Sequence, residues 1–281
     1  MSDRQRYPSD LTDAEWEILE PLIPAISPLA VNVKYARREI VNGILYVMRS
    51  GCPWRLVPHD LPDWGAVYYY FRKWRKDGIW DEIQKGLLKR VRKAEGRDEE
   101  PSAAVIDSQS IKTSAVRGPE KGFDQGKKIW GRKRHVLVDT QGNLMEVKVT
   151  AASASDLAGS KVMLEPLKEL FPRLALLWGD SHYGGTLIKW LEEQLGWKME
   201  VVRGLGAVPD ADTQASKSGK KGSKGSFKVL PRRWVVERSI AWVTRWRRLC
   251  RDHEGLPESS ESFIKLSASR RMLTHLASAA A

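Results

Sequence analysis

The sequence predicts an all-helical N-terminal part followed by an α/β part built on a mixed sheet. Three observations predict this class. Apolar residues recur at helical spacing up to residue 94, and short apolar or alternating runs typical of strands begin only after residue 102. The polar segment 94–103 (AEGRDEEPSA) separates the two patterns. We therefore expect one domain at residues 1–95 and a second at residues 100–281.

The N-terminal part is predicted to contain four helices. The first lies within 9–23, where Ser, Thr and Asp precede an apolar pattern that stops at Pro24. The other three are expected at 37–50, at 64–75 and at 80–94. The third contains YYYFRKWRK, in which aromatic and basic residues alternate. That pattern fits a helix-turn-helix type of DNA-binding unit and equally a plain helical bundle with solvated Lys and Arg.

The second part follows the order strand, hairpin, helix, strand, helix, strand, loop and two helices. The first strand ends at Asp107, and a turn at 140–143 with Gly142 joins the two strands of the hairpin. A further apolar strand ends at Asp180. The remaining elements are expected as helices at 156–170, 185–195, 231–249 and 259–278, a strand at 199–203, and a flexible Lys/Gly/Ser loop at 211–226. A mixed sheet with helices on its faces satisfies this order.

Composition favours a polyanionic partner. The formal net charge is +12, and residues 211–254 hold twelve Lys/Arg against four Asp/Glu. Residues 110–135 hold eight Lys/Arg against two acids. We interpret the two basic segments as a channel for a polyanion. With no apolar run long enough to span a bilayer and no signal-peptide core at its start, the sequence predicts a cytosolic protein without a membrane partner.

Three acidic residues stand out as candidate metal ligands. Asp107 and Asp180 each end a predicted buried strand, and Glu237 lies in a predicted helix rich in Arg and Trp. Active groups of α/β sheets gather at the carboxyl ends of strands, so the two Asp are expected to lie close together. Carboxylates are ligands for Mg²⁺, which retains waters and binds phosphates. With Glu237 they would complete a two-metal arrangement that acts on a phosphodiester.

Longer sequence blocks resemble those of the IS5 family of insertion-sequence transposases, within the DDE class. The blocks are LTDAEWEILEPLIP, GCPWRLVPHDLP, DSQSIKT, KGFDQGKKIWGRKRHVLVDTQGN, GDSHYGG and RRWVVERSIAWVTRWRRLCRDHE, in this order. The resemblance covers nearly the whole chain. It implies a ribonuclease H-like catalytic domain, preceded by a helical DNA-binding domain, with Asp107, Asp180 and Glu237 as the metal-binding triad.

The resemblance also implies the reaction and the partners. The enzyme would bind the terminal inverted repeats of its element, cut the DNA there, and join the 3′-hydroxyl ends to target DNA without a covalent protein–DNA intermediate. Two Mg²⁺ ions are expected as cofactors, with Mn²⁺ as a substitute. Two DNA ends must be held together, so a homodimer or larger assembly on double-stranded DNA is expected, in the bacterial cytoplasm at the nucleoid.

Several basic residues are candidate DNA contacts. Arg233 lies four residues before Glu237 and shares its helix face. The wider class has a Lys at the position of Thr244, and Arg245 or Arg248 are candidates to replace it. The further candidates for phosphate contact are Arg238, Lys112, Lys127, Lys128, Arg132, Lys133 and Arg134. His182 is a candidate auxiliary group, with a capping or packing role as the alternative.

Two other functions remain open from the sequence. One is a metal-dependent, structure-selective nuclease with the same triad and no strand transfer. The other is a non-catalytic DNA-binding repressor derived from a transposase. Transposition differs from both in producing joined DNA that depends on the triad.

Overall fold

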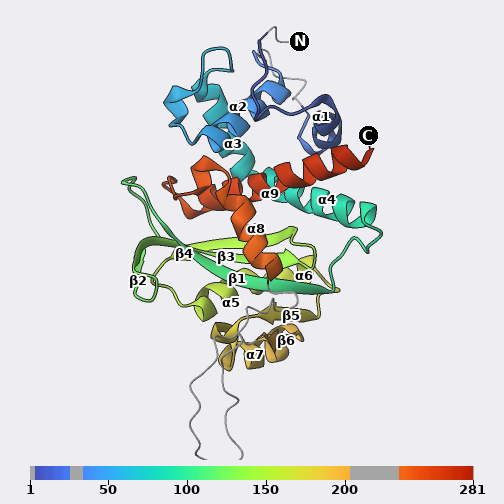
Figure 1. Cartoon of the computed structure of the whole chain (residues 1–281), viewed down its shortest axis with the longest axis vertical. Coiled ribbons are helices and arrows are strands. Elements are labelled where there is room, and N and C mark those ends of the chain that lie inside the picture. The colour runs from blue at the N-terminus through green and yellow to red at the C-terminus, as the bar shows by residue number, and fades with distance from the viewer. Residues whose placement is uncertain (1–3, 26–33, 203–233, 281) are drawn as a thin grey trace, which may run out of the picture.

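The computed structural model describes residues 4–25, 34–202 and 234–280. Within them, a layer of helices stands over a sheet (Figure 1). The helices of the N-terminal part are α1 (Asp13–Leu19), α2 (Arg37–Ser50), α3 (Trp64–Lys76) and α4 (Ile79–Ala94). These correspond to the helices predicted there. The loop predicted at 211–226 and Arg233 lie outside the described residues.

Local capping explains where these helices begin and end. Thr12 and Glu15 form a capping box at the start of α1, each side chain bonded to the backbone of the other. Asp63 caps α3 by accepting the amide of Gly65. Gly51 ends α2 at φ 73°, a left-handed conformation that glycine adopts without strain.

The aromatic residues of α3 divide between core and surface. Phe71 and Trp74 are buried, and both rings pack against Trp80 of α4. Tyr69 is 59% exposed. The buried rings fix the angle between α3 and α4. The structure therefore contains the helical packing that the bundle interpretation requires, and this packing does not depend on what the exposed residues bind.

The C-terminal helix α9 (Pro257–Ala280) joins the helical layer to the sheet. It packs against α1, α3 and α4 on one side and against β4 (Leu144–Ala151) on the other. Phe263 stacks on Phe71 of α3, with ring centroids 4.4 Å apart. Lys265 pairs with Asp81 of α4 and, at 2.7 Å, with Glu146 of β4. The helical layer therefore contains elements from both ends of the sequence, and an independent domain at 1–95 stays a prediction.

The mixed sheet predicted from the sequence is present. Its other strands are β1 (Ala103–Lys112), β2 (Gly122–Asp124), β3 (Ile129–Asp139), β5 (Leu176–Gly179) and β6 (Lys198–Val201). The order is β2-β3-β1-β5-β6, with β4 also paired to β3. The pairs β1–β3, β2–β3 and β3–β4 are antiparallel, whereas β1–β5 and β5–β6 are parallel. The three-residue β2 was not predicted, because its segment is dominated by charged residues and glycine.

Helices lie on both faces of this sheet. Along β1 and β3, Asp107 pairs with Val136 and Ser108 with His135, so the two pairs point to opposite faces. Helix α8 (Trp234–Thr244) covers the face of Val136, and α5 (Asp156–Leu164) covers the face of His135. Gly159 of α5 makes that contact possible: a Cβ there would lie 2.0 Å from Nε2 of His135.

Three predicted helices are divided, change helix type or end earlier than expected. The helix expected at 156–170 is divided at Pro166 into α5 and α6 (Leu167–Leu170), since proline has no amide to donate. The one at 185–195 is α7 (Thr186–Trp190) followed by a π-helical turn. The one at 231–249 ends at Thr244, before a 3₁₀ turn at Arg247–Leu249. Among the described residues, no helix combines the length and apolarity that crossing a membrane requires.

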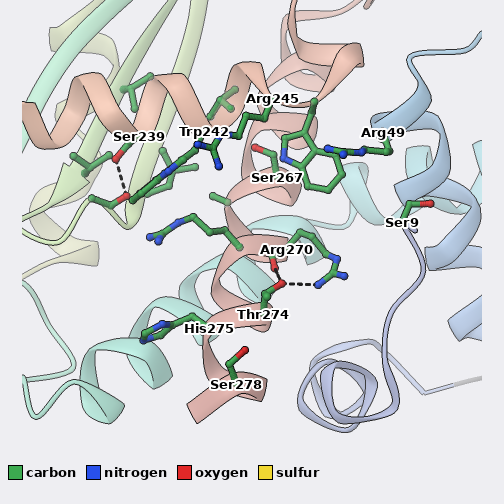
Figure 2. A pocket seen from close by; sticks show the side chains of 18 of the residues that line it. Ser9, Arg49, Ser239, Trp242, Arg245, Ser267, Arg270, Thr274, His275 and Ser278 are labelled. Atoms are coloured by element: carbon green, nitrogen blue, oxygen red, sulfur yellow. Dashed lines mark hydrogen bonds between the residues drawn. The ribbon is translucent and has the colours of Figure 1, made fainter. Parts of the chain in front are cut away.

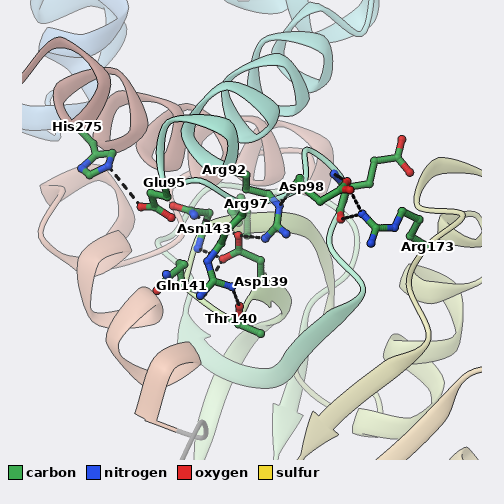
Figure 3. Close-up of polar contacts among 12 residues, drawn as sticks. Arg92, Glu95, Arg97, Asp98, Asp139, Thr140, Gln141, Asn143, Arg173 and His275 are labelled. Carbon is green, nitrogen blue, oxygen red and sulfur yellow. Dashed lines mark hydrogen bonds and ion pairs between the residues drawn. The ribbon is translucent and has the colours of Figure 1, made fainter. Parts of the chain in front are cut away.

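A buried ion pair ties the helical layer to the hairpin (Figure 3). Nη1 of Arg92, near the end of α4, lies 2.8 Å from Oδ2 of Asp139, and both side chains are buried. The other oxygen of Asp139 accepts the amides of Gln141 and Asn143, each at 2.9 Å. Asp139 thus holds the hairpin turn with one oxygen and binds Arg92 of the helical layer with the other. Burial in a low-dielectric site makes the loss of either partner costly.

We predict that Arg92→Met lowers the free energy of unfolding by about 3–5 kcal/mol, because the Asp139 carboxylate stays buried without its counter-ion. Urea unfolding followed by circular dichroism measures the change. Lys93→Met is the matched control: it removes an exposed pair with Glu99 at 3.4 Å and should cost less than about 1 kcal/mol. Equal effects of the two variants would contradict a stabilising role for the buried pair.

Candidate active site

The register of β1 and β5 places Asp107 and Asp180 side by side. The parallel pairing ends with Val105 opposite Trp178, and each aspartate lies two residues further along its strand direction. Both aspartates line one small cavity. The expectation that Asp107 ends its strand is wrong: β1 continues to Lys112, because its other edge stays paired with β3. Asp107 instead lies just past the point where β5 stops.

Backbone amides hold both carboxylates. Oδ1 of Asp107 accepts the amide of Ser108 at 2.7 Å. Asp180 caps the 3₁₀ turn Ser181–Tyr183, where its Oδ1 accepts the amide of His182 at 2.9 Å. The His182 ring turns back to the same side chain, with Nδ1 3.1 Å from Oδ2. These bonds restrict the rotation of both aspartates, and they make His182 a neighbour of the candidate site.

Glu237 lies in the first turn of α8 and is exposed. The residue before it, Val236, is buried and lines the same cavity as the two aspartates. The start of α8 is therefore held at the acidic pair. Within residues 4–25, 34–202 and 234–280, no three His, Cys, Asp or Glu side chains are grouped closely enough to hold a metal ion. The structure thus brings two of the predicted ligands together and leaves the third on an adjoining element.

A fourth acid, Asp156, supports the site from the opposite face of the sheet. The Ser108 hydroxyl donates to Oδ1 of Asp156 at 2.8 Å, and Nζ of Lys133 lies 3.1 Å from the same oxygen. Burial alone would raise the pKa of Asp156, but these two contacts outweigh it and hold the pKa below its ordinary value. Ser108 therefore bonds Asp107 through its amide and Asp156 through its hydroxyl.

The residue that caps α5 is Ser155, whose hydroxyl accepts the amide of Ala158, and Asp156 follows it in the first helical turn. The only sequence signal for Asp156 is its position directly after a helix cap. That position does not show whether the first helical turn faces solvent or packs on the sheet. Tyr183 was also missed. It is buried near Asp156 and Asp107, and burial raises its pKa well above the usual value, so the phenol stays protonated.

Three of the predicted DNA contacts are structural residues instead. Arg132 is fully buried and pairs with Asp252 at 3.2 Å. Arg134 is equally buried, and it donates to the carbonyl of Leu249 at 3.0 Å. Burial lowers the pKa of Arg134 to about 10, so it remains charged. Arg248 is the third. The arginines of β3 point inward because the strand is covered on both faces.

Other predicted contacts are also turned inward. Arg248 pairs with Glu254 at 2.7 Å and donates to the carbonyl of Cys52. Lys133 is 7% exposed and held by Asp156. Arg238 is half-buried and donates to the carbonyl of Gln141. None of these three has the open position that a direct phosphate contact requires.

The remaining basic candidates are accessible. The exposed residues are Lys112, Lys127, Lys128 and Arg245. Nζ of Lys127 lies 3.4 Å from the carbonyl of Ser108, directly after Asp107. A cation at that place can neutralise an anionic ligand that reaches the acidic pair. Of this accessible set, Lys127 lies at the candidate site and Arg245 directly follows α8.

The family of the chain follows from comparison with known proteins. Residues 98–268 match the family described as "Transposase DDE domain", and residues 11–84 match one described as "Putative transposase of IS4/5 family". The chain belongs to the DDE transposase domain family. That domain is ribonuclease H-like, acts on DNA and generally uses divalent metal ions. The resemblance to an insertion-sequence transposase is confirmed at this level.

One of two curated relatives comes from an insertion element. The chain is 31% identical over 108 residues to the "Insertion element IS402 uncharacterized 16.2 kDa protein" of Burkholderia cepacia, which covers 36% of this chain and 72% of that protein. It is 29% identical over 73 residues to the "Uncharacterized protein y4sN" of Sinorhizobium fredii, covering 26% and 58% of the two chains. No solved structure matches significantly.

We predict that His135 makes the transposase domain less stable as the pH falls. The ring is fully buried, with Nε2 3.0 Å from Oγ1 of Thr150, and burial lowers its pKa to about 4. Because the folded-state pKa lies below the unfolded value of about 6.5, stability is complete above pH 6.5 and falls as the pH drops towards 4. The loss attributable to His135 is about 3 kcal/mol.

Urea unfolding of the wild type and of His135→Gln between pH 4 and pH 7.5 measures this contribution. The glutamine amide can still donate to Thr150 but does not titrate. The difference in unfolding free energy between the two proteins should change by about 3 kcal/mol across the window. Parallel curves would show that the ring is not the titrating group.

Proposed function

We propose that this chain is the transposase of an insertion sequence, which cuts DNA at the ends of its element and joins the 3′-hydroxyl ends to target DNA by transesterification. The observation that carries the proposal is the β1–β5 register, which brings Asp107 and Asp180 to one edge within a DDE transposase domain. Glu237 is proposed as the third acid because Val236 lines the same cavity.

These carboxylates fit divalent magnesium by their chemistry. Asp107 and Asp180 present hard oxygen donors at adjacent positions, and two like charges so placed repel unless a cation joins them. We propose two Mg²⁺ ions, held by Asp107, Asp180 and Glu237, with Mn²⁺ as a substitute. When bound, such ions activate a water or 3′-hydroxyl and stabilise the leaving oxygen.

The residues around the triad would position the DNA. The Ser108 amide orients Asp107, and the Asp180–His182 contact places an imidazole beside the second acid, where it could meet the scissile phosphate. Lys127 would neutralise a phosphate that enters the site. Arg233 is proposed as a phosphate ligand on sequence grounds alone. Positioning and charge stabilisation would supply most of the catalysis.

We further propose how the protein engages its DNA. The helical part at 1–95 would help to recognise terminal inverted repeats, and residues 100–281 would carry the chemistry. The net charge of +12 and the exposed Lys112, Lys128 and Arg245 support binding to the backbone of double-stranded DNA. Two ends must be paired, so the active form would be a homodimer or larger assembly, acting at the nucleoid in the bacterial cytoplasm.

The proposal predicts joined DNA products that depend on the triad. The purified full chain, incubated with a DNA end that carries the inverted repeat, a target plasmid and Mg²⁺, should give strand-transfer products. Asp107→Ala, Asp180→Asn and Glu237→Gln should each lower the rate by at least about 100-fold while DNA binding in EDTA persists. Gel analysis of labelled ends measures both quantities.

The matched control is Glu192→Gln, at an exposed acid after α7, which should retain activity. A buried acid such as Asp139 would not serve, because its substitution disturbs the fold. Cleavage without joining would favour a structure-selective nuclease. DNA binding without either reaction would favour a repressor. Full activity of Asp107→Ala or Glu237→Gln would contradict the triad.

We predict that Ser108→Ala slows strand transfer by roughly 10- to 100-fold without weakening DNA binding, because the link from Asp156 to Asp107 is cut and the carboxylate is less well positioned. Ser108→Thr keeps the hydroxyl and should recover most of the rate. Ser102→Ala, at an exposed serine just before the same strand, is the matched control. Equal rates for both alanine variants would show that Asp156 does not position the site.

A further inference from the structure

A cavity of about 620 Å³ lies between the helical layer and α8 (Figure 2). Its walls come from distant parts of the sequence: Arg49 from α2, Trp242 from α8, Arg271 and Thr274 from α9, and Val136 from β3. Val136 pairs with Asp107, so the cavity and the Asp107 side chain lie on the same face of the sheet. The cavity is thus placed beside the candidate active site, with α8 between them.

The cavity is strongly basic. Its charged lining residues are Arg49, Arg245, Arg270 and Arg271, and no acid belongs to the lining within the described chain. Glu15 neutralises Arg270 through an ion pair. Within the described residues, Arg49, Arg245 and Arg271 form no direct ion pair, and Arg271 donates a hydrogen bond to the neutral side chain of Asn143. Three positive charges therefore converge on this space. Asp139 and Glu95 act on Arg271 from outside the cavity lining, and no ion pair within the described residues involves Arg49 or Arg245.

Aromatic side chains form part of the wall and bring two arginines together. The guanidinium carbon of Arg271 lies 4.0 Å from the centroid of the Trp242 ring, and that of Arg238 lies 4.5 Å from the same ring. Burial and the charge of Arg238 lower the pKa of Arg271, and the nearby carboxylates of Asp139 and Glu95 offset only part of that effect. Two cations on one indole repel each other, and an anion bound beside them would relieve that repulsion.

We propose that this cavity binds the backbone phosphate of a nucleotide in the DNA strand that reaches the acidic triad. The proposal rests on the proposed function and adds to it a DNA contact shared by both parts of the chain. The volume is well above that of a phosphate ion and within the usual range for nucleotide-sized ligands, roughly 300–1,000 Å³. Indole rings beside arginines suit a sugar and base next to the phosphate.

The geometry of α8 supports the same path. Glu237 lies in its first turn, and Thr244 ends it. Seven residues of α-helix rise about 10 Å, the axial distance covered by about three phosphates of one B-DNA strand at roughly 3.4 Å each. A strand that follows α8 from the triad therefore reaches Arg245 and the cavity after about three nucleotides.

The test is DNA binding by the full chain in EDTA, measured by fluorescence anisotropy of a labelled duplex at several KCl concentrations. Arg49→Gln and Arg245→Gln should each reduce the slope of log K against log[KCl] by about 0.9, the value for one phosphate contact. Affinity near 0.1 M KCl should fall about 3- to 10-fold. Arg173→Gln, which removes an exposed arginine paired with Asp98, is the matched control and should leave the slope unchanged.

Three results would overturn the inference or its premise, and they differ from one another. If the slope of log K against log[KCl] is unchanged in both variants while the wild type binds DNA normally, the cavity does not bind DNA phosphate, and the transposase proposal remains intact. Absence of DNA binding by the wild type would sink the transposase proposal itself. If inorganic phosphate raises the Tm of the wild type but not of Arg49→Gln, while the slopes are equal, the cavity is a site for a small anion. A far-ultraviolet circular dichroism spectrum confirms that each variant is folded.

Discussion

The parallel pairing of β1 with β5 is the constraint on which the candidate site depends. Because Val105 lies opposite Trp178, the next positions on the same face of the two strands are those of Asp107 and Asp180. A shift of one residue would send one carboxylate to the opposite face. The apolar residues before each aspartate, Ile106 and Leu177 among them, are buried and fix this register. The core of the sheet thus sets the geometry of its acidic edge.

The residues on the two faces of the sheet contact the acidic pair in different ways. On the face of α5, Asp156 and Lys133 form a buried polar cluster that holds Ser108 and, through its amide, Asp107. On the other face, α8 brings Val236 to the acidic cavity and Trp242 to the basic one. Helix α9 and the Arg92–Asp139 pair join this assembly to the helical layer. A DNA strand along α8 would therefore contact elements that are rigidly connected.

The sequence predicts much of this arrangement because its signals are local. Apolar periodicity located α2, α3 and α4, and the Gly142 turn located the β3–β4 hairpin. The sequence-based predictions that the structure contradicts concern residues whose burial depends on tertiary packing. The arginines at 132, 134 and 248 look like surface charges in the sequence, yet Asp252 and Glu254 draw two of them into the interior. Trp234 lies in an apolar stretch of the sequence, yet it is 43% exposed and packs on Arg238. The contact between Asp156 and Ser108 could not be predicted, because it forms only when α5 packs on the sheet.

We propose that Asp107, Asp180 and Glu237 together hold both metal ions at one shared site. Iron-mediated backbone cleavage tests it most directly: Fe²⁺ replaces Mg²⁺, peroxide and ascorbate generate local radicals, and mass spectrometry maps the cuts. We expect cuts next to residues 107, 180 and 237 that Mg²⁺ suppresses and that Asp107→Ala abolishes together. Cuts near only one of the three positions, or a pattern unchanged in Asp107→Ala, would contradict a shared site.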